Sequence, residues 1–239
     1  MGLEDIGQFV EGVWMPKGEK HLLEWMQNSK GAHRENGTMT YQWAKQVEAR
    51  QAMVEHISEW PSKMFVDVGA HVGLWSMWWS PLMDATLAFE PIPTMAALYH
   101  ANMKGRGAYH LEEKAVGEFP GTLKLAFNPE NTGNTHKVHS KDEGLDVFTV
   151  PLTTVDYEIV RFAGPRVGAM KIDCEGTELE VVKGATLMID RDRPVIIVEQ
   201  KKGAEYYGAD PLGAVKFLEM ECGYRTRKVM SGDHIMVPR

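Results

Sequence analysis

Cysteine and long apolar runs are scarce in this sequence. The 239 residues include only Cys174 and Cys222, too few and too far apart for a disulfide framework or a thiolate zinc site, so a reducing compartment is expected. No apolar run approaches the roughly 18 residues of a membrane span. Acids stand among the first residues, MGLEDIGQFVEG, where a signal peptide would be basic and then apolar. We therefore expect a cytoplasmic protein without a membrane span.

Positive charge is also in deficit. Lysine and arginine total 26 against 33 aspartates and glutamates, giving a formal net charge of -7 and a pI near 5.7. Such a balance disfavours a long phosphate-tracking surface, although it leaves room for a local basic patch. Nucleic acid is therefore an unfavoured partner.

Hydrophobic residues make up 44% of the chain, enough to bury a full core in one domain with an appended segment. From residue 64 onward, apolar strand-like runs alternate with helical segments, which predicts a largely parallel sheet covered on both faces. The predicted strands are Met64–Gly69, Ala85–Glu90, Tyr109–Leu111, Lys114–Val116, Gly121–Phe127, Val150–Val155, Val167–Asp173 and Pro194–Glu199, with a closing antiparallel pair at Tyr224–Val229 and His234–Val237. Between them we predict helices at Leu74–Leu82, Thr94–Lys104, Glu178–Ile189 and Pro211–Cys222, and a long polar loop at Asn128–Gly144.

Residues 65–90, FVDVGAHVGLWSMWWSPLMDATLAFE, carry the most information. An apolar strand ends in Asp67 and runs into the turn from Gly69 to Gly73, and the next strand ends in Glu90. Glycines let the backbone approach a ligand closely, and a carboxylate at the tip of the second strand can bind a ribose diol. This unit predicts a nucleotide-type cofactor.

The spacing of the small residues favours S-adenosylmethionine over a dinucleotide. A pyrophosphate fingerprint needs a glycine between Gly69 and Gly73 that admits the phosphates, and Ala70, His71 and Val72 do not supply it. Asp67 suits a donor with a cationic amino group. Another nucleotide, or a glycine turn that binds nothing, stays open at this point.

The segment Lys171–Glu178, KIDCEGTE, follows a second apolar strand. In an extended chain Lys171, Asp173 and Glu175 share one face, and they would reach the cofactor if this strand lies beside Met64–Gly69. Asp173 or Glu175 could then act as a general base, with Lys171 holding the other carboxylate ionised; a purely structural ion pair is the alternative.

The sequence offers two further candidate sites. Asp173, Glu175 and Glu199 could bind a divalent metal, but no histidine or asparagine stands at a recognised metal spacing, so a metal is not favoured. The polar loop carries Asn131-Thr132-Gly133-Asn134-Thr135-His136, which could recognise a polyhydroxylated acceptor, and His136 could serve as a base near neutral pH. An ordinary solvated loop is the alternative.

Residues 1–60 precede the sheet and hold four of the seven tryptophans. We expect an N-terminal cap segment at residues 1–60 with helices at His21–Gln27 and Tyr41–Trp60, followed by one domain at residues 61–239 that carries the sheet. Packing of the aromatic residues across the sheet edge is the equally weighted alternative.

The two segments together resemble the FkbM family of S-adenosylmethionine-dependent methyltransferases. The motifs that carry the resemblance are DVGA-x-x-G at residues 67–73, F-E-P at 89–91 and K-I-D-x-E-G-x-E at 171–178, with Thr154-Val155-Asp156 resembling a further family step. The resemblance covers residues 64–200 and implies a Rossmann-like, class I methyltransferase: an α/β fold with a seven-stranded, mostly parallel sheet whose last strand is antiparallel, and helices on both faces. His71 and Cys174 depart from the residues more usual at their places.

The resemblance also implies the activity: methylation of hydroxyl oxygens on sugars, glycans or small metabolites, with S-adenosylhomocysteine as product. N-methylation of protein or nucleic acid, and a binding module without turnover, are the alternatives. The candidate catalytic residues are Asp173, Glu175, Lys171 and His136. The candidate donor-binding residues are Asp67, Gly69, Ala70, His71, Gly73, Glu90, Pro91, Ala115, Val116 and Asp173.

Overall fold

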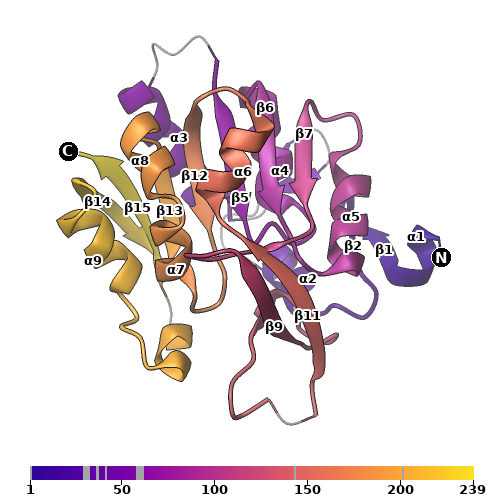
Figure 1. Cartoon of the computed structure of the whole chain (residues 1–239). Helices are drawn as coiled ribbons and strands as arrows, with labels where there is room; N and C mark the ends of the chain where they lie inside the picture. The colour runs from indigo at the N-terminus through magenta and orange to yellow at the C-terminus, as the bar shows by residue number, and fades with distance from the viewer. Residues whose placement is uncertain are drawn as a thin grey trace.

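The computed structural model describes residues 2–28, 33–35, 38–40, 42–57, 62–142, 144–200 and 202–239. Its centre is a seven-stranded sheet of order β14-β15-β13-β12-β5-β6-β7 (Figure 1). The strands are β5 (Met64–Val68), β6 (Ala85–Phe89), β7 (Tyr109–Glu112), β12 (Val167–Ile172), β13 (Val195–Glu199), β14 (Tyr224–Met230) and β15 (Asp233–Pro238). Every strand pair is parallel except the two made by β15. The predicted seven-stranded Rossmann-like layout is confirmed.

The strand order places a ligand site at the carboxyl ends of β5 and β12. These two strands are neighbours, and the chain proceeds outward from them in opposite directions, through β6 and β7 on one side and β13 on the other. In open α/β sheets the crevice at such a reversal is where ligands bind. The glycine turn follows β5 and the acidic segment follows β12, so the topology brings the two motifs together.

Alternation along the strands divides the core into two faces. Phe65, Ala169 and Ile197 belong to one apolar cluster, which packs under α3 (Trp43–Ile57) and α4 (Leu74–Trp79). Trp75, Trp78 and Trp79 lie in this cluster, as their helical spacing predicts. The opposite face is covered by α6 (Val155–Phe162), α7 (Glu178–Lys183), α8 (Thr186–Asp192) and α9 (Gly213–Met220).

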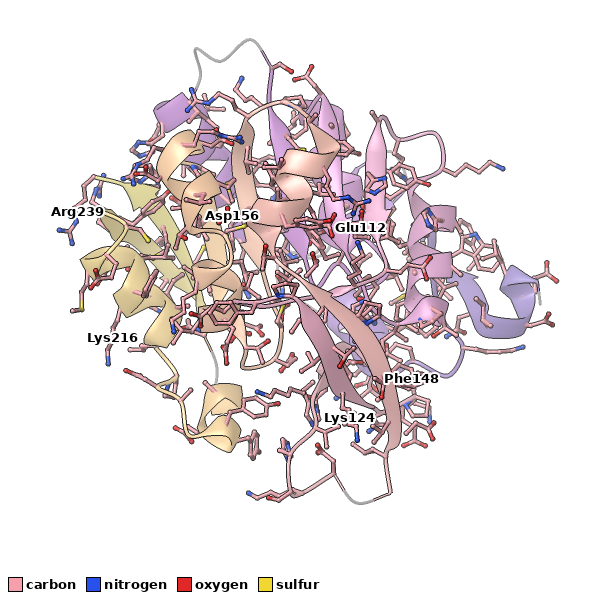
Figure 2. All side chains as sticks on the ribbon, in the orientation of Figure 1. Glu112, Lys124, Phe148, Asp156, Lys216 and Arg239 are labelled. Carbon is pink, nitrogen blue, oxygen red and sulfur yellow. The ribbon has the colours of Figure 1, made fainter. Side chains whose placement is uncertain are left out.

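A second, smaller sheet projects from the carboxyl edge of the main one (Figure 1). Its order is β10-β9-β11-β8, from β8 (Ala115–Val116), β9 (Gly121–Phe127), β10 (His136–Lys137) and β11 (Asp146–Thr153). Lys124 and Phe148 mark its two long strands in Figure 2. The polar loop between β9 and β11 contains the 3-10 turn η2 (Thr132–Asn134), and this sheet holds that loop beside the switch point.

The N-terminal region begins with α1 (Leu3–Ile6) and the hairpin of β1 (Gly7–Val10) and β2 (Val13–Pro16). The hairpin packs on α5 (Pro93–Met103), where Asn102 bonds both the N–H and the carbonyl of Trp14 at 2.7 and 2.9 Å. Then come α2 (His21–Asn28), β3 (His33–Glu35), β4 (Thr38–Thr40) and α3. The two predicted helices exist; Tyr41, Trp60 and the expected boundary between residues 60 and 61 lie outside the described residues, so the division into cap and domain stays a prediction.

Several predicted boundaries were wrong. The strand predicted at Val150–Val155 runs from Asp146 to Thr153, and α6 then begins because Thr154 accepts a hydrogen bond from the Tyr157 N–H at 3.1 Å. The helix predicted at Glu178–Ile189 is two helices. A Cβ on Gly184 would lie 2.1 Å from the carbonyl oxygen of Gly117, so the chain breaks at the glycine that allows this approach. Helix α4 continues into η1 (Ser80–Leu82), as predicted, and η3 (Lys202–Tyr207) follows β13.

Among the described residues, no helix combines the length and the apolar character required to cross a bilayer.

Candidate functional site

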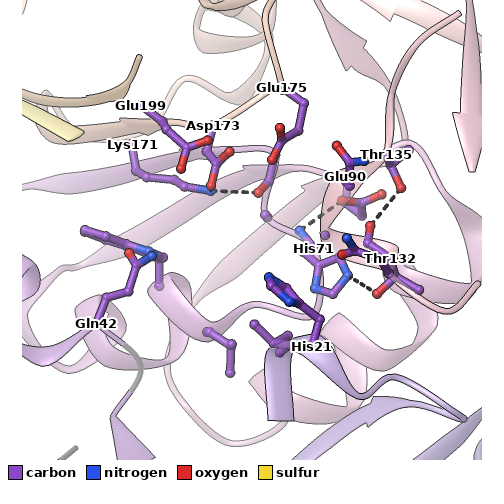
Figure 3. A pocket seen from close by; sticks show the side chains of 18 of the residues that line it. His21, Gln42, His71, Glu90, Thr132, Thr135, Lys171, Asp173, Glu175 and Glu199 are labelled. Carbon is purple, nitrogen blue, oxygen red and sulfur yellow. Dashed lines mark hydrogen bonds and ion pairs between the residues drawn. The ribbon is translucent and has the colours of Figure 1, made fainter. Parts of the chain in front are cut away.

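The carboxyl edge of the sheet opens into a cavity of about 450 Å³, which an apolar pocket of about 70 Å³ adjoins. Gly69, Glu90, Thr135 and Asp173 line both. Figure 3 shows two groups of side chains across this space. We call Gly69–Gly73 with Glu90 the turn side, and Lys171, Asp173, Glu175 and Glu199 the acid side.

The backbone of the turn side leaves no room for larger residues. Gly69 has φ +74°, and a Cβ there would lie 1.9 Å from the carbonyl oxygen of Asp173. Gly73 has φ +88° and precedes α4, with the ring of Tyr99 at 2.8 Å from an added Cβ. Both positions require glycine, for backbone conformation and for contact. The turn and the Asp173 segment are therefore in direct contact.

Glu90 joins the turn to the adjoining pocket. Its carboxylate accepts hydrogen bonds from the N–H groups of His71 at 2.9 Å and Ile92 at 2.8 Å. Burial raises the pKa of Glu90 to about 7, although the two N–H groups favour the ionised form. A carboxylate fixed in this way keeps lone pairs for a ribose diol.

The adjoining pocket is mostly apolar and lies beyond Glu90. Pro91, Ala115 and Val116, predicted as donor-binding residues, line it together with Leu123 and Leu125 of the small sheet. A mostly apolar pocket beside a buried carboxylate could take an apolar ring such as a nucleobase. Sequence reasoning predicted the strand that carries these two leucines but gave them no role in the site.

The acid side brings three carboxylates together. Ligand oxygens of Asp173, Glu175 and Glu199 all lie within 4.8 Å of one another. Lys171 Nζ is 3.5 Å from Asp173 Oδ2 and donates to the Gly69 carbonyl at 2.8 Å. Burial disfavours the ammonium, but Asp173 and Asp67 outweigh this and raise the Lys171 pKa above its ordinary value. A charged lysine therefore links the acid side to the turn.

The acids converge for a reason other than the predicted one. Strand β12 ends at Ile172, and Glu175 adopts a left-handed φ of +50°, so the face shared by an extended chain does not continue to it. Instead Glu178 accepts hydrogen bonds from the N–H groups of Cys174 at 3.1 Å and Gly176 at 3.0 Å, which fixes the loop. Cys174 packs against the apolar core and lines the smaller pocket.

Comparison with known proteins agrees with this geometry. The family described as the methyltransferase FkbM domain matches residues 67–226, which include the turn, Glu90 and the acid side. The chain belongs to the FkbM methyltransferase family. A relative named "Methyltransferase 1", from Beauveria bassiana (strain ARSEF 2860), is 25% identical over 151 residues, 54% of this chain and 61% of that protein. The chain thus spans about three fifths of the length of this curated relative.

Solved structures resemble the FkbM domain in fold. A fibrillarin/Nop5p complex matches with a TM-score of 0.50 at 12% identity, over 98% of this chain and 97% of the other. A methyltransferase FkbM from Methylobacillus flagellatus KT matches with a TM-score of 0.47 at 14% identity, over 73% of this chain and 43% of the other. At these identities the fibrillarin similarity shows the fold alone.

Two predicted residues of the FkbM domain do not line either space. The Asp67 side chain shares a strand face with Phe65, toward α4, and accepts a hydrogen bond from Ser76 Oγ at 2.6 Å; burial raises its pKa. Asp67 Oδ1 lies 3.9 Å from Lys171 Nζ. Asp67 therefore helps to position Lys171 and does not face the cavity. Gly73 is likewise a structural position, covered by Tyr99.

His136, the predicted alternative base, is also placed elsewhere. Its ring bonds the Asn134 carbonyl and Asp142 in the polar loop, and it lines neither space. The neighbouring Asn131, Thr132 and Asn134 do line the cavity. The loop therefore reaches the cavity through the polar residues predicted for acceptor recognition, and not through His136.

A hydrogen-bonded chain that the sequence did not predict joins the N-terminal region to the turn. Buried Glu19 accepts from the Leu22 N–H at 3.0 Å, from the Thr132 N–H at 2.8 Å and from Thr132 Oγ1 at 2.6 Å. Because Thr132 gives its one hydroxyl proton to Glu19, His71 Nε2, 2.8 Å away, must donate to Thr132 Oγ1. Burial lowers the pKa of His71 to about 4, so its ring is neutral near pH 7 and Nδ1 carries the lone pair.

The opposite wall also comes from segments that sequence reasoning left unassigned. Buried Lys45, on α3, lies with its Nζ 2.5 Å from Asp233 Oδ2 of β15, and Lys45, Gln42 and Ser231 line the cavity. A lone lysine or glutamate in an amphipathic segment carries no local signal of such a role. Tertiary packing alone brings these residues to the site.

Proposed function

We propose that this protein transfers a methyl group from S-adenosylmethionine to a hydroxyl oxygen of a sugar, a glycan or another small hydroxylated metabolite. The observation that carries the proposal is the continuous path from the apolar pocket, past Glu90 and the glycine turn, to the three carboxylates. A donor extended along that path would present its sulfonium methyl group toward the acid side.

The donor fits the path section by section. The adenine would occupy the pocket lined by Pro91, Ala115 and Val116, and the ribose diol would donate to Glu90. The methionine part would then lie over Gly69, close to Lys171 and Asp173, which offer a cation for its carboxylate and an anion for its amino group. His71 Nδ1 supplies a further acceptor on this side.

The acid side supports oxygen as the acceptor atom. In an in-line displacement the hydroxyl oxygen bonds to the methyl carbon while the carbon–sulfur bond breaks, and S-adenosylhomocysteine leaves as a neutral thioether. The hydroxyl proton must pass to a base. Glu175 lines only the larger cavity, on the acceptor side, whereas Asp173 lines both spaces and pairs with Lys171. We therefore assign the proton to Glu175 and the alignment of donor and acceptor to Asp173.

The rest of the wall suits a hydroxylated acceptor. Gln42, Asn131, Asn134, Thr135 and Ser231 face the cavity and offer both donors and acceptors of hydrogen bonds. The three carboxylates would repel a phosphate backbone, in keeping with the net charge of -7. We do not propose a metal among these carboxylates, because the Lys171 ammonium already supplies a positive charge 3.5 Å from Asp173.

Calorimetry and a methyl-transfer panel test the proposal in two steps. S-adenosylmethionine and S-adenosylhomocysteine should bind and NAD should not; the reverse result would exclude the donor assignment. Labelled donor is then offered to hydroxylated sugars and glycans, to protein and to RNA. The expected result is label in the sugar fraction, with mass spectrometry identifying the new linkage as a methyl ether. Label on nitrogen in protein or RNA would overturn the choice of acceptor while leaving the donor assignment intact.

A further inference from the structure

His136, His139 and Asp142 form a second cluster of ligand-type side chains, outside both spaces of the site. They stand at three-residue intervals, His136 at the start of β10 and the other two in the segment that leads from β10 to β11. His136 Nε2 lies 3.0 Å and His139 Nδ1 lies 3.3 Å from Asp142 Oδ1. Their side chains are 10%, 10% and 5% exposed, so water screens the charge of Asp142 little.

The hydrogen bonds decide which ring nitrogens carry lone pairs. His136 Nδ1 lies 2.7 Å from the carbonyl oxygen of Asn134, which can only accept, so this nitrogen is protonated and donates. In the neutral ring Nε2 then carries the lone pair that faces Asp142. A histidine whose other nitrogen donates to a backbone carbonyl is the usual arrangement of a metal ligand.

The second histidine is oriented in the same sense. The backbone N–H of Lys141 donates to His139 Nδ1 at 3.2 Å, so this nitrogen is an acceptor too. Asp142 is held by its other oxygen, Oδ2, which accepts from the His139 N–H at 2.6 Å, and its Oδ1 is left facing the two rings. Three electron-rich atoms therefore converge, which is unfavourable unless a positive centre lies among them.

A single added proton does not give all three of these acceptor atoms a hydrogen-bond donor. A proton on His136 Nε2 would explain its contact with Asp142, but His139 Nδ1 already accepts from Lys141 and would still face the same carboxylate oxygen. A metal ion would satisfy all three atoms, in exchange for the long 3.2 Å hydrogen bond. Two imidazole nitrogens and one carboxylate oxygen suit a small divalent transition ion, and Zn²⁺ above all.

We propose that His136, His139 and Asp142 bind one Zn²⁺ ion, with water as the remaining ligand, and that this ion fastens the polar loop over the cavity. His139 stacks on Tyr206 of η3 with ring centres 4.4 Å apart, and the Tyr207 hydroxyl donates to the Lys137 carbonyl at 2.6 Å. The ion would thus fix the loop that carries Thr132 and Thr135 in the position where His139 and Lys137 contact η3, the segment that follows Glu199. Its role is structural, and it does not depend on the identity of the methyl acceptor.

Direct zinc measurements on the full chain test the proposal. The protein is treated with a chelator, the chelator is removed, and Zn²⁺ is titrated in competition with a chromophoric chelator; bound metal is counted by mass spectrometry. One Zn²⁺ per chain is expected. Saturation at about 100 times the dissociation constant should raise Tm by about 5–10 °C. Co²⁺ in place of Zn²⁺ should give the visible absorption of a four-coordinate site with nitrogen and oxygen ligands.

Matched variants locate the ion. Asp142→Asn and His139→Ala should weaken zinc binding by more than about 100-fold, beyond the 10- to 100-fold typical of losing an outer partner. The control His110→Ala removes a histidine that pairs with Glu112 on the main sheet, and it should bind zinc as the parent does. If a variant does not fold, the parent titration still decides. No binding at micromolar zinc, or equal binding by parent and Asp142→Asn, would overturn the proposal.

Discussion

The turn side and the acid side of the cavity are built in different ways. The turn side comes from one continuous stretch, β5 to Glu90, and its shape is fixed by backbone: left-handed glycines, a close approach to Asp173 and N–H groups that hold Glu90. The acid side gathers residues from two strands, and charge and hydrogen bonds position them. Changes of volume should therefore damage the first, and changes of charge at constant shape should damage the second.

The largest effect is expected from a charge change on the acid side. Glu175→Gln keeps the shape of the side chain but removes its proton-accepting carboxylate, so turnover should fall by about 10²- to 10⁴-fold. The dissociation constant of S-adenosylmethionine should change by less than about threefold, because Glu175 does not line the apolar pocket. Single-turnover kinetics and calorimetry measure the two quantities.

The exposed Glu205 gives the matched control for this change. Glu205→Gln should turn over as the parent does. Equal turnover of Glu175→Gln and the parent would remove Glu175 from the chemistry and leave Asp173 or Glu199 as the base.

A volume change should break the turn side. In Gly69→Ala the added methyl would meet the Asp173 carbonyl at 1.9 Å and require a left-handed alanine. We expect the free energy of unfolding to fall by about 2–4 kcal/mol and donor affinity to fall by at least about 10-fold. Denaturant unfolding and calorimetry measure them.

The variant Gly105→Ala distinguishes the cost of a left-handed backbone from the cost of a steric clash. Gly105 also has a positive φ, +77°, but open space surrounds it, so its variant should lose only about 1 kcal/mol and bind the donor normally. Equal losses in the two variants would show that the close contact with Asp173 is unimportant.

Glu90 should be sensitive to both shape and charge, because backbone N–H groups fix its position while its negative charge would bind the ribose of the donor. Glu90→Gln should weaken donor binding by about 10- to 100-fold, the loss of hydrogen bonds to a charged acceptor. Burial raises the Glu90 pKa to about 7, so acidification through that pH protonates the carboxylate. Parent affinity should accordingly fall from about pH 8 to about pH 6, and the fall should be much smaller in Glu90→Gln. The exposed Glu113→Gln is the control, and a parent profile flat over this range would contradict the role of Glu90.

The smallest effect is expected where the N-terminal region meets the turn. Thr132→Val keeps the volume but deletes the hydroxyl between Glu19 and His71. The buried Glu19 carboxylate then loses one hydrogen-bond donor, so the free energy of unfolding should fall by about 1–3 kcal/mol. The affinity for S-adenosylmethionine should change by less than about 10-fold. Thr122→Val, on an exposed strand position, is the control. A loss no greater than that of the control would show that water replaces the hydroxyl.

The local sequence pattern was sufficient to predict those elements whose conformation depends mainly on residues adjacent in the chain. Strands β5, β6, β12 and β13 begin and end within one residue of their predicted bounds, because each is a short, mostly apolar run that stops at a glycine or a carboxylate. Helix α6 was missed because its apolar face is short and its start depends on the Thr154 cap. Prediction of the cavity lining was uneven in the same way: Glu90, Gly69 and the acids were expected near a ligand and line the cavity, whereas no role was predicted for Glu19 and Lys45.

The sequence by itself determined that a glycine turn and a carboxylate end two adjacent strands, and that an acidic segment follows a third. Only the tertiary structure decided which of these groups face the cavity. Asp67 turns toward α4 because strand residues alternate between faces, while Glu90, just beyond its strand, is turned to the site by the N–H groups of His71 and Ile92. The same holds for His136 and His139, which lie six and three residues before Asp142 and contact it. The direction of these side chains depends on packing that no local pattern encodes.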